Sequence, residues 1–101
     1  MNKRKHRTFD EFELDYFTKH PRELKKYIEV ALQEYQRDGD QKAFLASLYV
    51  AARVRGGFGK LARQTGLNRE NLYRALGTRS DPRLSTVIQV IHQLGYSLRL
   101  G

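Results

Sequence analysis

The stretch FGKLARQTGLNRENLYRAL, Phe58 to Leu76, predicts two short helices joined by a sharp turn. Gly66 stands where the chain has to turn with a positive φ, a conformation that glycine adopts without a Cβ clash. The side chain of Asn68 is expected to cap the second helix by accepting a hydrogen bond from a free backbone N–H. Leu72 and Ala75 have helical spacing and should face the core, so the polar residues between them point outward.

The outward side of the second helix is polar and carries two arginines. A short helix of this kind fits the major groove of DNA, where side chains read the base edges. Arginine can bond guanine O6 and N7 together, and glutamate can accept from a cytosine amine. The alternative is a solvated Arg69–Glu70 pair that touches nothing specific. Arg74 is the leading candidate because it projects from the middle of this side, and the predicted base-reading residues are Arg69, Glu70, Asn71, Tyr73 and Arg74.

Other polar residues of this region are expected to bind the DNA backbone, because phosphate contacts gather near helix N-termini and on flanking loops. Lys60 and Arg63 lie on the first helix of the pair, which would cross the backbone. Asn68 would serve as a cap and a phosphate contact at once. The predicted phosphate contacts are Lys60, Arg63, Asn68, Thr78, Arg79, Ser80 and Arg83.

The charge distribution favours an anionic partner. The formal net charge is +8, from 19 Lys and Arg against 11 Asp and Glu. From Phe58 onward seven basic residues stand against two acids, whereas residues 9–19 are acidic. A basic surface also aids solubility, so the position of the excess positive charge along the chain matters more than its size.

The composition narrows the class of protein. A chain of 101 residues suits one domain with a modest core. It has no cysteine, and its three histidines lack the spacing of metal ligands, so no disulfide, metal site or cofactor is expected. No apolar run is long enough for a membrane span or a signal segment, which predicts a cytoplasmic protein without a membrane partner. No constellation of catalytic residues is present, so an enzyme is not expected.

Hydrophobic periodicity predicts an arm followed by helices. Residues 1–8 are basic without an apolar pattern and predict a flexible arm. Residues 9–39 should hold two N-terminal helices: a short one opened by a Thr8–Glu11 capping box, with its aromatic residues in the core, and an amphipathic one from Pro21. Residues 40–101 should hold the helix-turn-helix DNA-binding domain, with further helices at about 41–55 and 83–94, and residues 9–101 should form one compact domain.

The last residues, Tyr96 to Leu100, alternate between apolar and polar side chains and predict a strand. A lone strand is not stable. Its partner would be the same strand of a second subunit, which would make the protein a homodimer through residues 96–100. The alternative, equally open, is an irregular tail whose Leu98 and Leu100 pack on the helices.

Three segments resemble the Xre/Cro-type, HigA-like addiction-module antidote proteins. They are residues 56–76 (GGFGKLARQTGLNRENLYRAL), residues 81–87 (DPRLSTV) and residues 94–100 (LGYSLRL). The resemblance implies an all-α, lambda-repressor-like helix-turn-helix bundle with an N-terminal helical extension and a short C-terminal strand. It also implies a repressor that binds a palindromic operator of its own operon and neutralises a small toxin, often of the RelE/ParE type.

Two other functions remain open from the sequence. One is a stand-alone regulator of a prophage or mobile element that has no toxin, and the identity of the adjacent gene separates it from an antidote. The other is a helix-turn-helix scaffold that binds only proteins, which a DNA-binding assay separates from a repressor. If a toxin is bound, the N-terminal helices are its expected surface, because the rest of the chain is committed to DNA.

Overall fold

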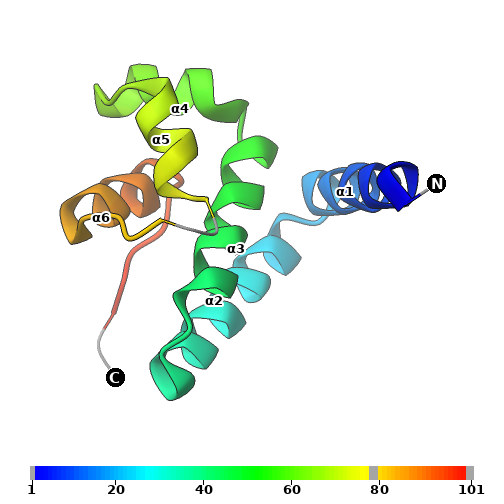
Figure 1. The fold of residues 1–101 in the computed structure, drawn as a ribbon, viewed down its shortest axis with the longest axis horizontal. Helices are drawn as coiled ribbons and strands as arrows, with labels where there is room; N and C mark the ends of the chain where they lie inside the picture. The colour runs from blue at the N-terminus through cyan, green and yellow to red at the C-terminus, as the bar shows by residue number, and fades with distance from the viewer. Residues whose placement is uncertain (1, 78–79, 100–101) are drawn as a thin grey trace.

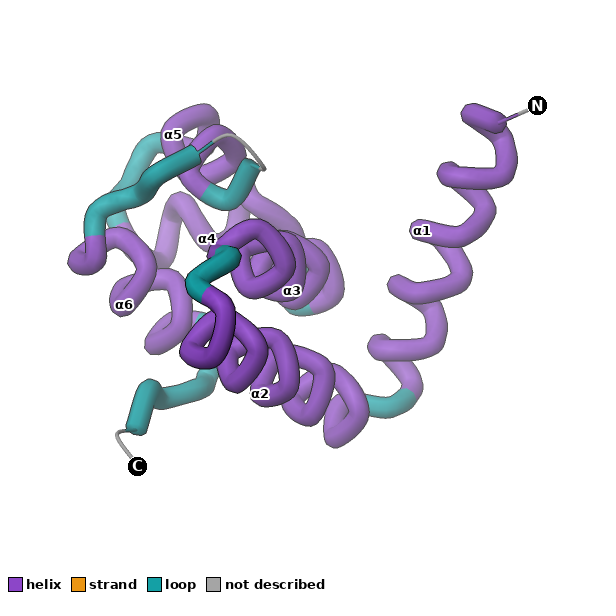
Figure 2. The backbone as a smooth tube through the Cα atoms, turned by 60° about the horizontal axis from the view of Figure 1, so that its bottom comes forward, coloured by secondary structure: helices purple, strands orange, loops and turns teal. Residues whose placement is uncertain are grey.

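The computed structural model describes residues 2–77 and 80–99, and those residues form six helices and no strand (Figures 1 and 2). The all-α class predicted from the sequence is therefore confirmed. The helices are α1 (Asn2–Lys19), α2 (Pro21–Asp38), α3 (Gln41–Val54), α4 (Gly57–Thr65), α5 (Arg69–Ala75) and α6 (Leu84–Gln93).

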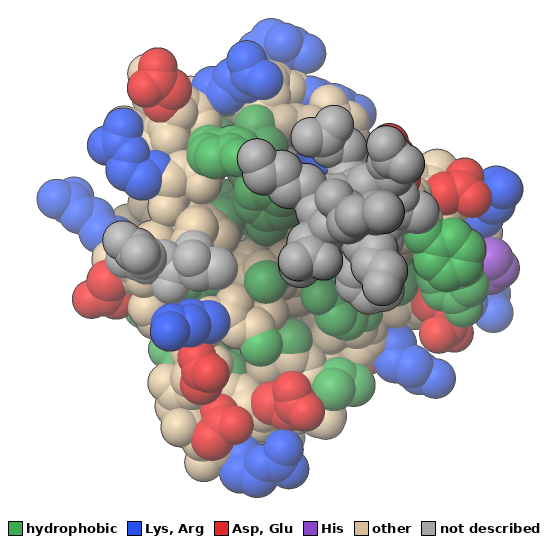
Figure 3. Space-filling model, turned by 45° about the vertical axis from the view of Figure 1, so that its right-hand side comes forward, with side chains coloured by type: hydrophobic (Ala, Val, Ile, Leu, Met, Phe, Trp, Pro, Cys, Tyr) green, Lys and Arg blue, Asp and Glu red, His purple; other side chains and the backbone are tan. Residues whose placement is uncertain are grey.

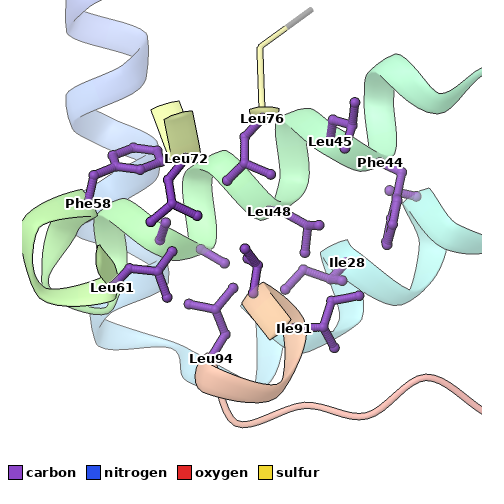
Figure 4. Close-up of a cluster of buried hydrophobic side chains, with 14 of the residues drawn as sticks. Ile28, Phe44, Leu45, Leu48, Phe58, Leu61, Leu72, Leu76, Ile91 and Leu94 are labelled. Carbon is purple, nitrogen blue, oxygen red and sulfur yellow. The ribbon is translucent and has the colours of Figure 1, made fainter. Parts of the chain in front are cut away.

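The core is built around α3, which packs against α1, α2 and α4. Its Leu48 is completely buried, and Figure 4 shows it near Ile28 of α2 and Ile91 of α6. Phe58 and Leu61 of α4 fill the other end of the same cluster. A helix that is apolar over most of its circumference must be covered on several sides, and α3 meets that expectation. The α4–α5 pair is thus fixed to a shared core and does not stand alone.

Helix α1 is longer than the sequence predicts. It begins at Asn2, so the predicted start at Phe9 is wrong, and the flexibility of the basic arm over residues 1–8 stays a prediction. The capping box at Thr8 has no helix start to cap, because this residue lies inside the helix. The physical reason is that the basic stretch contains no glycine or proline, and lysine and arginine are good helix formers.

The aromatic residues of α1 divide between the core and the surface. The ring of Phe17 stacks on that of Tyr27 of α2, with centroids 5.2 Å apart, and both pack against the core. Burial raises the pKa of Tyr27 above its usual value, and the nearby Glu13 carboxylate raises it further. In contrast, Phe12 is 68% exposed and Tyr16 is 40% exposed. The expectation that the aromatic residues of this helix anchor it in the core therefore holds for Phe17 and is wrong for Phe12 and Tyr16. The side chain of Phe9 lies outside the described part of the structure.

The chain after α6 forms no strand within the described residues. Tyr96–Arg99 is irregular, and Leu100 lies outside the described part of the chain. The hydroxyl of Tyr96 accepts a hydrogen bond from Arg55 Nη2 at 3.2 Å, and Leu98 lines a hollow beside Leu32 of α2. This matches the irregular tail that was the alternative. A strand needs a partner, so its pairing between two subunits stays a prediction that a single chain does not test.

Candidate nucleic-acid interface

The turn between α4 and α5 has the geometry that the sequence predicts. Gly66 adopts φ 74°, and its N–H donates to the carbonyl of Ala62 at 2.9 Å, closing α4. The hydroxyl of Thr65 donates to the carbonyl of Leu61 at 2.9 Å and accepts from the N–H of Leu67 at 3.2 Å. This side chain pins both sides of the turn, which fixes the direction in which α5 leaves it.

Asn68 is the N-cap of α5, as predicted. Its Oδ1 accepts hydrogen bonds from the N–H groups of Glu70 at 2.8 Å and Asn71 at 3.1 Å. Two of the backbone donors that a helix start leaves unpaired are thereby satisfied. Both bonds use the side-chain oxygen, so the side-chain NH2 group would be the donor in a hydrogen bond to a phosphate.

The outer side of α5 presents polar side chains to solvent. Arg69, Asn71 and Arg74 are exposed, whereas Leu72 is buried beneath them. Glu70 forms an ion pair with Arg74 at 4.0 Å, and both side chains are more than three-quarters exposed. The solvated pair considered from the sequence thus joins Glu70 to Arg74 and not to Arg69. An exposed pair of this length contributes little free energy, so it leaves Arg74 available to a ligand.

Tyr73 differs from its neighbours because its ring packs back against the protein. It meets the rings of Phe58 and Tyr49 edge-on, with centroids 5.4 and 5.7 Å apart. Its hydroxyl lies 3.4 Å from that of Tyr49. The residue remains 56% exposed. This arrangement suits a residue that holds α5 against α3 and α4.

A groove brings four of the predicted DNA contacts together: Asn71, Arg74, Ser80 and Arg83. It runs between α5 and the start of α6, where Arg83 is the N-cap residue. Arg83 lines it together with Asn71 and Arg74 of α5, and Asp81 adds one acidic side chain. Arg74 is predicted to read bases and Arg83 to bind phosphate. The two residues therefore share one surface although their predicted roles differ.

The loop after α5 divides into a described and an undescribed part. Thr78 and Arg79, both predicted phosphate contacts, lie outside the described residues. The hydroxyl of Ser80 donates to the carbonyl of Ala75 at 2.7 Å, and its N–H donates to that of Gly77 at 3.2 Å. Both donors of Ser80 are thus engaged within the protein and are not free to bind a phosphate.

Gln41 is a residue of this region that the sequence did not single out. Its side-chain Nε2 donates to the carbonyl of Ser80 at 2.9 Å, which ties the loop after α5 to the start of α3. The two residues are far apart in the chain, and no local pattern joins them. Only the packing of α3 beside this loop makes the contact.

The two cations of α4 stand apart from the groove. Lys60 is exposed, and its stem lies so close to Gly56 that a Cβ there would come within 2.7 Å of Lys60 Cδ. Lys60 lines a separate hollow with Arg55, Gln64 and Gln93. Arg63 is also exposed on α4. Figure 3 shows Lys and Arg side chains gathered at the upper end of the molecule, the end where α4 and α5 lie in Figure 1.

Other kinds of site find no support in the described residues. No group of three or more His, Asp or Glu side chains within them is placed to hold a metal ion. Among the described helices, none is both long and apolar enough to cross a membrane. Asn71, Arg74 and Arg83 line one groove at the surface, whereas Lys60 lines a separate hollow.

The described residues define a small all-helical protein that presents a short, capped, arginine-bearing helix to solvent. Residues 8–101 match the family described as probable addiction module antidote protein, and the chain belongs to this family. Membership implies a cognate toxin as a partner, so the antidote part of the resemblance is confirmed. Comparisons with curated proteins and with solved structures gave no significant match.

Proposed function

We propose that this antidote is a sequence-specific DNA-binding repressor of the Xre/Cro helix-turn-helix type. It represses its own operon in the cytoplasm and neutralises a toxin of the RelE/ParE type. The observation that carries the proposal is the outer side of α5, where Arg69, Asn71 and Arg74 are exposed around a helix start capped by Asn68. In a helix-turn-helix, such residues contact base edges in the major groove.

In the proposed complex, α5 lies in the major groove and the cations around it bind phosphates. Arg74 reads guanine, and Asn71 reads adenine, because these side chains match the paired acceptors and donors of those bases. Glu70 gives up its ion pair with Arg74 and accepts from cytosine. The phosphate contacts come from Lys60, Arg63, Asn68 and Arg83.

The active form proposed here is a homodimer on a palindromic operator, because a helix-turn-helix pair reads two half-sites about one helical turn apart. The exposed side of α6 is its proposed contact surface. Leu84 is 73% exposed and Ile88, one turn further, is 38% exposed. Residues 84–98 contain no Asp, Glu, Lys or Arg. Two copies of a chain with net charge +8 repel each other, and this charge-free side is where they approach at least cost.

Titration of the purified protein onto the DNA upstream of its own gene tests the repressor function. A gel shift is measured over a salt series, with a scrambled DNA of the same length as the control. We expect tighter binding to the upstream DNA, and an affinity for both DNAs that falls with salt as counterions are released. Equal affinity for the two DNAs contradicts a sequence-specific repressor. Absence of any salt-dependent shift favours the protein-binding scaffold.

A further inference from the structure

The outer side of α1 carries an exposed group of rings, which we call the aromatic patch: Phe12, Tyr16 and His20. Phe12 is 68% exposed and Tyr16 is 40% exposed. The rings of Tyr16 and His20 are stacked, with centroids 4.3 Å apart and planes inclined by 21°. His20 Nδ1 also lies 2.8 Å from the carbonyl oxygen of Tyr16. The end of α1 thus holds the rings of Tyr16 and His20 in one arrangement before any partner binds.

The charge around the aromatic patch is opposite to that of the whole chain. Residues 9–19 hold four acids and one lysine, whereas the chain carries +8. Glu11 is exposed beside the patch, and Asp15 pairs with Lys19 at 3.1 Å on the surface. Figure 3 shows hydrophobic side chains next to a histidine at this edge of the molecule, with acidic and basic side chains around them. The acidic side chains next to the patch disfavour a phosphate ligand there, whereas the basic residues of α1 lie in its first turns.

The fold itself does not cover the aromatic patch. The inner side of α1 is occupied by Phe17, which stacks on Tyr27 of α2. Aromatic residues are enriched where protein partners dock, because they bury a large apolar area at a small cost in side-chain entropy. Two exposed aromatic residues one turn apart, with acids around them, therefore fit a partner that offers an apolar pocket with a basic rim.

We propose that the aromatic patch is the docking site of the cognate toxin, and that the toxin presents such a basic-rimmed pocket to it. The inference rests on the antidote function and not on DNA binding. A basic protein is repelled by the cationic surface around α5 and attracted to the acidic residues of α1 next to the patch, Glu11 and Asp15. Helices α1 and α5 lie on different sides of the molecule in both ribbon views (Figures 1 and 2), so an antidote with a toxin on α1 keeps its DNA surface open.

The test uses the full chain and the purified product of the gene adjacent to its own. Affinity is measured by calorimetry for the wild type and for the double variant Phe12→Ala, Tyr16→Ala. We expect the double variant to lose at least about tenfold in affinity, because aromatic anchors dominate interface energies. Val30→Ala is the matched control: Val30 is 47% exposed on α2, and its loss should leave the affinity unchanged.

A charge variant supplies the second arm. Glu11→Lys should weaken toxin binding most at low salt, while Glu29→Lys on α2 should not. Wild-type affinity in the double aromatic variant overturns the proposal, as does an equal loss in Val30→Ala or no binding of the adjacent gene product to the wild type. A gel shift with the same variants keeps the two functions separate: toxin binding lost with DNA binding retained supports the patch whether or not the repressor function holds.

Discussion

Arg74 is the residue that most directly links the structure of α5 to sequence reading. Its side chain is 76% exposed and, among the described residues, forms an ion pair with Glu70 at 4.0 Å. Replacement by alanine should therefore leave the fold unchanged. We expect Arg74→Ala to weaken the free energy of binding to the operator by about 1–3 kcal/mol, because a bidentate contact to guanine is lost. The loss on scrambled DNA should be much smaller. Gel shifts on both DNAs measure the difference.

Lys60→Ala is the comparison for Arg74→Ala. A phosphate contact carries no sequence information, so this variant should lower the affinity for both DNAs equally. The slope of log affinity against log salt concentration should become shallower by about one unit. If Arg74→Ala behaves in that way instead, Arg74 is a phosphate contact. If the slope of Lys60→Ala is unchanged, Lys60 is outside the interface, in keeping with its place in a separate hollow.

Tyr73 has two possible roles that two substitutions separate. The packing of its ring on Phe58 and Tyr49 indicates a positioning role. Tyr73→Phe keeps the ring and should bind the operator as the wild type does. Tyr73→Ala should lower the free energy of unfolding by roughly 1 kcal/mol through the lost ring contacts, and weaken DNA binding. Chemical denaturation and gel shifts measure the two effects. A loss of sequence preference in Tyr73→Phe would instead assign the hydroxyl to base reading.

Among the elements, α5 is the one that depends most on a single side chain at its start. Asn68→Ala removes both capping bonds and should lower the free energy of unfolding by about 1 kcal/mol. Asn68→Asp keeps an acceptor and should retain that stability, yet it places a negative charge where a phosphate is proposed. If Asn68→Asp has the stability of the wild type but binds DNA more weakly, Asn68 contacts phosphate in addition to capping α5. Unchanged DNA binding in this variant removes Asn68 from the interface.

Local patterns made much of this architecture predictable. Interactions between residues close together in the chain determine the helices from α2 to α6, the turn at Gly66 and the cap at Asn68. The sequence therefore predicts these features. The extension of α1 was missed because its first residues have no apolar periodicity, although they include nothing that breaks a helix. The contact of Gln41 with the loop after α5, and that of Tyr73 with Tyr49, join residues that are far apart in the chain. No local sequence pattern predicts such contacts.

At the scale of the whole molecule, the two proposed partners use surfaces of opposite charge. The acidic, aromatic end of α1 and the cationic surface around α5 are carried by different helices on different sides (Figure 1). If both proposals hold, one 101-residue chain engages a toxin and an operator together. A third surface, the charge-free side of α6, is left for a second copy of the chain.

That third surface is tested by the mass of the protein in solution. The chain of 11.8 kDa should behave as a dimer of about twice that mass in light scattering or sedimentation. Leu84→Lys and Ile88→Lys each bring like charges into the proposed contact and should give a folded monomer that binds a half-site but loses the advantage of two. Val30→Lys on α2 is the control. A dimer that resists both substitutions but dissociates when residues 96–101 are deleted would favour pairing of the C-terminal strands, and a wild-type monomer at all concentrations would contradict a homodimer.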